Sequence, residues 1–107
     1  MKINGIQQLG VGVTDIEEAW NWYRSFFSMD ILMFDEEDVA ELMQAHTDGK
    51  PRKRHAILAL NLEGGGGFEI WKHTGKNPTP IDFEIQLGDL GINIGVLKCQ
   101  NSEIAYQ

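Results

Sequence analysis

Residues 6–27, IQQLGVGVTDIEEAWNWYRSFF, decide the fold, because a short alternating strand passes without a linker into an amphipathic helix. Successive side chains of a strand point to opposite faces of the sheet. One face is therefore apolar and carries Leu9, Val11 and Val13. The other face is nearly bare, since it carries Gln8, Gly10 and Gly12. Glycine inside a strand often marks a close approach of a ligand or another backbone, so the bare face is a candidate binding surface.

The helix that follows has a clear start. Thr14 or Asp15 is its N-cap, and each has a glutamate three residues later, which is typical of a capping box. Apolar side chains then recur at three- and four-residue steps: Ile16, Ala19, Trp20, Tyr23, Phe26 and Phe27. We expect this stripe to cover the apolar face of the strand and to leave the bare face open.

Composition bounds the class of protein. A chain of 107 residues, 42% of them hydrophobic, suits one small domain. Its net charge of -7 argues against nucleic acid and anionic membranes as partners, because both reward clustered Lys and Arg. A small molecule is the expected partner. The single cysteine, Cys99, rules out an internal disulfide, and neither a signal peptide nor a membrane-spanning apolar run is present. The sequence therefore predicts a cytoplasmic protein.

The middle of the chain predicts a strand, a turn and a short helix. Residues 29–34 are apolar and compatible with a strand, and the acidic run 35–38 is interpreted as the turn that ends it. Val39, Leu42, Met43 and His46 then fall at helical spacing before Gly49 and Pro51 close the segment.

A basic cluster at the next strand entry has two interpretations. Lys50, Arg52, Lys53 and Arg54 either attract an acidic group of a ligand or form a solvated strand end.

Two further strands form a hairpin, with residues 55–62 and 68–73 on either side of a glycine turn. In the second strand Phe68 and Ile70 share one face, and Glu69, Trp71 and His73 share the other. A carboxylate in mid-strand is costly to bury unless it is paired, hydrogen-bonded or bound to a metal. Glu69 is therefore a candidate functional residue.

The chain then begins to repeat itself. An offset of 86 positions pairs Asn101 with Asp15 and Leu97 with Val11, so a second strand and capped helix are expected after the linker. We expect a first module at residues 1–74, a linker at 75–91 and the beginning of a second module at 92–107. The second module stops barely inside its helix, which indicates a piece of a longer protein or completion by a second chain.

These stretches resemble the vicinal oxygen chelate superfamily, which includes glyoxalases, extradiol dioxygenases and bleomycin-resistance proteins. The resemblance rests on IQQLGVGVTDIEEAWNWY, HAILALNLEGGGGFEIW and LGDLGINIGVLKCQNSEIAY, and it spans nearly the whole chain. It implies an α+β fold in which a βαβββ module forms a curved mixed sheet with the helix on the convex face. It also implies a divalent metal (Zn, Ni, Mn, Mg or Fe) on the concave face, with ligands at positions that correspond to Gln8 and Glu69.

Three functions follow as hypotheses. The first is a metal-dependent lyase, isomerase or epimerase in which Glu69 is a metal ligand, the catalytic base, or both. The second is a metal-free binding protein of the bleomycin-resistance type, favoured because Ile94 takes the place of Gln8 in the second module. The third is a fragment that folds or forms a homodimer without activity.

The remaining site candidates have open alternatives. Trp71 either stacks on the substrate or fills the curved sheet. His55 and His73 either bind substrate or lie at the rim, since each begins or ends a strand.

Overall fold

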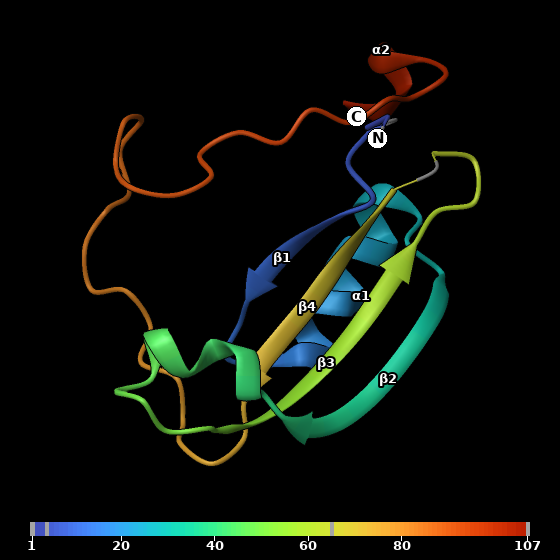
Figure 1. Ribbon diagram of the computed structural model, residues 1–107. Coiled ribbons are helices and arrows are strands. Elements are labelled where there is room, and N and C mark those ends of the chain that lie inside the picture. Colours follow the sequence, from blue (N-terminus) through green and yellow to red (C-terminus); the bar gives the residue numbers. More distant parts are fainter. Residues whose placement is uncertain (1, 4, 65, 107) are drawn as a thin grey trace.

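The computed structural model describes residues 2–3, 5–64 and 66–106. Its elements run β1 (Gln8–Gly12), α1 (Ile16–Phe27), β2 (Ile31–Val39), a 3₁₀ helix η1 (Glu41–His46), β3 (Lys53–Leu60), β4 (Gly67–His73) and α2 (Ser102–Ala105). The strands form one curved sheet in the order β1-β4-β3-β2, in which β1 is parallel to β4 and the other neighbours are antiparallel (Figure 1). The predicted α+β class and the strand–helix–three-strand order are confirmed.

The start of α1 selects one of the two predicted caps. Asp15 is extended, and its carboxylate accepts a hydrogen bond from the Glu18 N–H at 2.9 Å. The helix ends at Ser28 in the left-handed region (φ 50°), where its N–H donates to the Arg24 carbonyl at 3.0 Å. A strand with a bare face is thus followed at once by a well-capped helix.

The core lies between α1 and one face of the sheet. Ile57 of β3 and Ile70 of β4 are its largest fully buried side chains, and Phe68 packs on Tyr23 of α1 with ring centroids 4.4 Å apart. Leu9, Val11 and Val13 pack against this core, as their alternation predicts. Burying each large apolar side chain contributes about 1.5–3 kcal/mol, so this layer holds α1 on the sheet.

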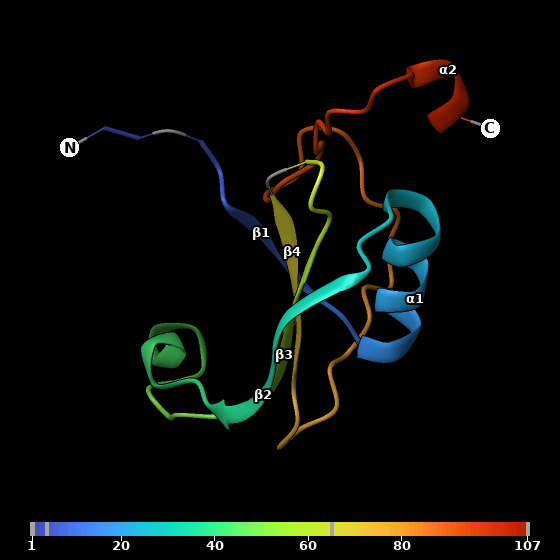
Figure 2. The same cartoon turned by 90° about the vertical axis from the view of Figure 1, so that its right-hand side faces the viewer.

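The opposite, concave face of the sheet is free of α1. Figure 2 shows α1 on one side of the sheet and η1 on the other, near one end. The short helix predicted around Val39 to His46 is therefore present, and it forms a wall beside the concave face.

The acidic run at residues 35–38 differs from its prediction as a turn, because it continues β2. Its neighbours on β3 explain this, since Asp38 pairs with the cation Arg54 and Asp35 lies within hydrogen-bond distance of His55. Opposite charges across an antiparallel pair are favourable, and such contacts override the weak strand propensity of Asp and Glu.

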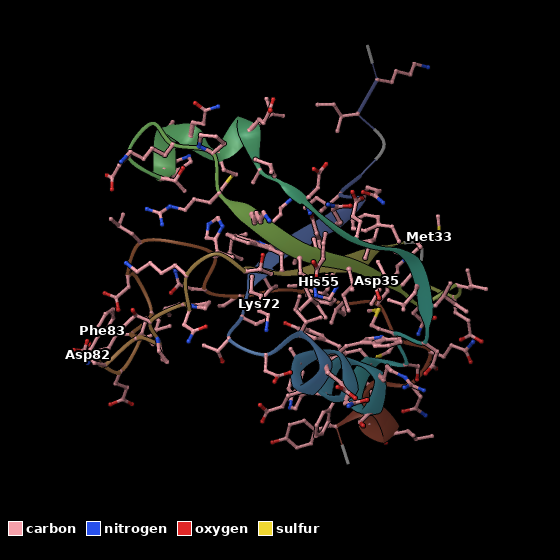
Figure 3. All side chains as sticks on the ribbon, turned by 90° about the horizontal axis from the view of Figure 1, so that it is seen from below. Met33, Asp35, His55, Lys72, Asp82 and Phe83 are labelled. Carbon is pink, nitrogen blue, oxygen red and sulfur yellow. The ribbon has the colours of Figure 1, made fainter. Side chains whose placement is uncertain are left out.

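The C-terminal part follows the predicted repeat only in its helix. Asn101 caps α2, accepting hydrogen bonds from the N–H groups of Glu103 and Ile104. Residues 92–99, predicted as a strand, are not paired into the sheet, and a strand is stable only when a neighbour satisfies its N–H and C=O groups. Figure 3 shows Asp82 and Phe83 of the preceding segment projecting away from the sheet.

No helix in the described part of the chain is both long enough and apolar enough to cross a membrane.

Candidate functional site on the concave face

Gln8 and Glu69 meet on the concave face, although they are 61 residues apart in sequence. The Gln8 amide Nε2 donates a hydrogen bond to Glu69 Oε2 at 2.5 Å. Parallel pairing of β1 with β4 places the two residues near each other, since Gln8 pairs with Gly67 and Gly10 pairs with Glu69. The two side chains predicted to share a site are therefore in direct contact.

Trp71 lies beside the bare glycines of β1. A Cβ on Gly10 would lie 3.8 Å from Trp71 Nε1, and one on Gly12 would lie 3.7 Å from Trp71 Cζ2. Because neither glycine has a side chain, the indole ring occupies the space that β1 leaves free. Trp71 therefore forms part of the floor of the concave face next to Glu69.

Arg54 is a cation in this group that sequence reasoning did not place beside Glu69. Its Nη1 lies 3.9 Å from Glu69 Oε1, so the carboxylate stands between the amide of Gln8 and a guanidinium. In the register of the hairpin Arg54 pairs with His73 and Leu58 pairs with Glu69, so the Arg54 side chain has to extend along the strand to approach the carboxylate. Between Arg54 and Leu58 on the same face of β3 stands the small, fully buried Ala56, which leaves room for the long side chain to extend along the strand.

An open pocket of about 500 Å³ lies between this group and η1. Arg54, Glu69 and Trp71 line it from the sheet, and the end of β2 and the start of η1 line it from the other side. This volume lies in the range of small-molecule sites, which bury an apolar body and orient it with a few polar groups. A second hollow of about 410 Å³ lies between β1 and residues 92–95 and contains none of the predicted site residues.

The two predicted histidines lie on different faces. His73 shares the face of Glu69, and its ring packs edge-on against Trp71 with centroids 5.3 Å apart. His55 lies on the α1 side of the sheet, where its Nε2 is 2.6 Å from Asp35 Oδ1 (Figure 3). Side chains alternate between the two faces along β3, so His55 lies on the same face as the core residue Ile57. The structure thus brings together Gln8, Glu69, Trp71 and His73, but not His55.

A divalent metal does not fit the residues of this chain by themselves. Gln8 and Glu69 offer two ligands, whereas a catalytic zinc usually has three protein ligands and an open position. No group of three or more His, Cys, Asp or Glu side chains within residues 2–3, 5–64 and 66–106 is placed to hold a metal. The guanidinium of Arg54, 3.9 Å from Glu69 Oε1, would also repel a cation bound there. The predicted metal stays a prediction that rests on the resemblance.

One sequence signal could have placed Arg54. Alternation along β3 puts Arg54 on the same face as Ala56 and Leu58, and the hairpin places that face with Glu69. Alternation does not determine the register of the hairpin. That register pairs Arg54 with His73 and so sets how far Arg54 lies from Glu69 along the sheet.

Comparison with known proteins establishes the fold. No protein-family model matches the chain, and no curated protein matches it at a significant level. A solved structure of a glyoxalase family protein from Bacillus cereus is similar, with a TM-score of 0.61 at 14% sequence identity. The match covers 86% of this chain and 60% of that protein, so the chain spans about 60% of its length. The chain therefore has the fold of that glyoxalase family protein.

Proposed function

We propose that this glyoxalase-fold chain binds a small oxygenated molecule on the concave face of its sheet. The observation that carries the proposal is the contact between Gln8 and Glu69, because two polar side chains 61 residues apart in sequence converge on one point of this surface. The pocket of about 500 Å³ beside them gives a ligand room, and Trp71 gives it a flat apolar contact. A neutral amide next to a carboxylate can accept from and donate to the oxygen groups of one ligand.

A second candidate is an isomerase or lyase reaction in which Glu69 moves a proton. It is favoured by the separation of 3.9 Å between Glu69 Oε1 and Arg54 Nη1, which places a base and a cation at one pocket. A carbonyl oxygen that accepts from Arg54 would be polarised, and Glu69 could then take a proton from the neighbouring carbon. Gln8 would hold the carboxylate in position through its hydrogen bond.

Ligand binding is tested by amide spectra of the labelled full chain. Small aldehydes, hydroxy acids, oxo acids and amino acids are added one at a time, and shifts are expected in the concave-face strands and in the Trp71 indole N–H. That indole signal is identified by its loss in Trp71→Phe. Gln8→Ala and Glu69→Ala should weaken binding, while the exposed control changes Gln7→Ala and Glu84→Ala should not. Shifts confined to the α1 side, or equal effects of site and control changes, would refute the proposal.

Metal content separates the binding function from the predicted metal-dependent enzyme. Metal-free protein that keeps its ligand affinity supports binding without a metal. A stoichiometric divalent metal that is lost in both Gln8→Ala and Glu69→Ala would instead support the metal-dependent lyase or isomerase.

A further inference from the structure

Arg54 carries a buried donor without an acceptor. Its Nη1 has no hydrogen-bond partner within the part of the chain that the structure describes, and Glu69 Oε1, at 3.9 Å, is beyond hydrogen-bond distance. Leaving a buried charged donor unsatisfied is costly, so native proteins usually supply an acceptor. Since Arg54 lines the pocket of about 500 Å³, a ligand oxygen is the natural acceptor.

The other charges around this pocket are acidic. Asp38, Glu41 and Glu69 also line it, so the pocket lining holds three carboxylates and one guanidinium. Asp38 has one oxygen occupied by the N–H of Val39, at 2.7 Å, and Glu69 has one occupied by Gln8, at 2.5 Å. Asp38 and Glu69 each keep one carboxylate oxygen for a ligand. A simple anion would be attracted by Arg54 but repelled by three carboxylates, and a simple cation would leave Arg54 unpaired.

The apolar part of the lining fixes the rest of the ligand. Val39, at the end of β2, and Met43, in η1, line the pocket together with Trp71. A flat ring combined with aliphatic and thioether groups suits a ligand with an aliphatic or thioether side chain.

We infer that this pocket takes a zwitterionic small molecule of the α-amino acid type with an apolar side chain. Its carboxylate accepts a hydrogen bond from Arg54 Nη1, its ammonium group faces the carboxylates of Glu69 and Asp38, and its side chain packs on Trp71. This inference rests on the proposed small-molecule function and names the class of ligand. The positive charge that Arg54 supplies at Glu69 takes the position in which a metal was predicted, which agrees with the poor fit of a metal to these residues.

The test compares three molecules that share one aliphatic body. L-Leucine carries both charged groups, 4-methylpentanoate lacks the amine, and 3-methylbutylamine lacks the carboxylate. Each molecule is titrated into the full chain, and binding is measured by calorimetry and by amide spectra. Leucine should have the highest affinity. Each analogue should bind about tenfold more weakly or worse, since each loses a hydrogen bond between charged groups.

Arg54→Gln should lower the leucine affinity by about tenfold or more and should remove the preference of the site for leucine over 3-methylbutylamine. Arg52→Gln is the matched control, because it removes the same charge from the same basic segment without touching the pocket lining. Arg54→Lys keeps the charge but loses the planar fork, and we expect an intermediate affinity. Urea unfolding of each variant verifies that it is folded.

Several outcomes overturn the inference. They are equal affinity for leucine and 4-methylpentanoate, equal effects of Arg54→Gln and Arg52→Gln, and no Arg54-dependent binding of leucine, methionine or phenylalanine. If other small molecules still shift the concave face in a manner that depends on Gln8 and Glu69, only the amino acid class is wrong. If no molecule does so, the proposed function fails as well.

Discussion

A methyl group at Gly67 tests how tightly the hairpin closes beside β1. Gly67 begins β4, is buried, and pairs with Gln8 on one side and Leu60 on the other. A Cβ there would stand well inside van der Waals contact with Leu60 Cδ2 and with the carbonyl oxygen of Ala59. The leucine tip can rotate away, but the carbonyl belongs to β3, which is held by paired strands on both sides.

The expected cost follows from two opposing effects. Overpacking that forces a backbone shift costs about 1–3 kcal/mol. Alanine also restricts the unfolded chain relative to glycine, which returns about 0.4–1 kcal/mol. We therefore expect Gly67→Ala to lower the free energy of unfolding by about 1–2 kcal/mol, and each kcal/mol lowers the Tm of a small domain by about 4–8 °C.

Gly10→Ala is the matched control, because its Cβ would meet only Trp71 Nε1, at an ordinary contact distance of 3.8 Å. It should leave stability unchanged or raise it by up to about 1 kcal/mol, because the added methyl group meets no backbone atom and alanine restricts the unfolded chain. Urea unfolding, monitored by circular dichroism, compares both variants with the parent. The free energies are compared at one common slope of unfolding free energy against urea concentration. A Gly67→Ala protein as stable as the parent, or a Gly10→Ala protein less stable than Gly67→Ala, would contradict this account of the sheet.

Three further predictions concern α1 and assembly. Asp15→Ala should lower the free energy of unfolding by about 1 kcal/mol, because it removes the acceptor of the Glu18 N–H, whereas Thr14→Ala should change it less; thermal unfolding of the pair distinguishes the two N-caps that the sequence allows. Burial raises the pKa of Tyr23 above its ordinary 10.0, so its contribution to stability is fully present below about pH 10 and is lost as the pH rises through the raised pKa. Tyr23→Phe should therefore lose less stability than the parent between about pH 8 and strongly alkaline pH, and Tyr106→Phe, at an exposed position, should behave as the parent in the same urea series. Exposed apolar side chains such as Phe83, Ile85 and Leu87 favour association, so we expect a homodimer of twice the 12.1 kDa chain mass by light scattering; a concentration-independent monomer would contradict this.

Much of the site could be predicted because its residues follow short-range periods. The two-residue period of β1 and β4 places Gln8 and the glycines on one face, and it places Glu69, Trp71 and His73 on the same side of the sheet. His55 shows the limit of this reasoning. Its residue type suggested a ligand-binding role, but a one-residue step along β3 sends it to the α1 side, where it contacts Asp35.

The sequence by itself determined the elements whose stability is local. The cap at Asp15, the apolar stripe of α1 and the alternation of β1 are set by neighbours a few residues apart, which is why the strand–helix unit could be predicted. Only the tertiary structure decided that the acidic run extends β2 and that Arg54 reaches Glu69. Both depend on which residues of separate strands lie side by side, and that register is set by the whole sheet and by the length of its turns rather than by any local pattern.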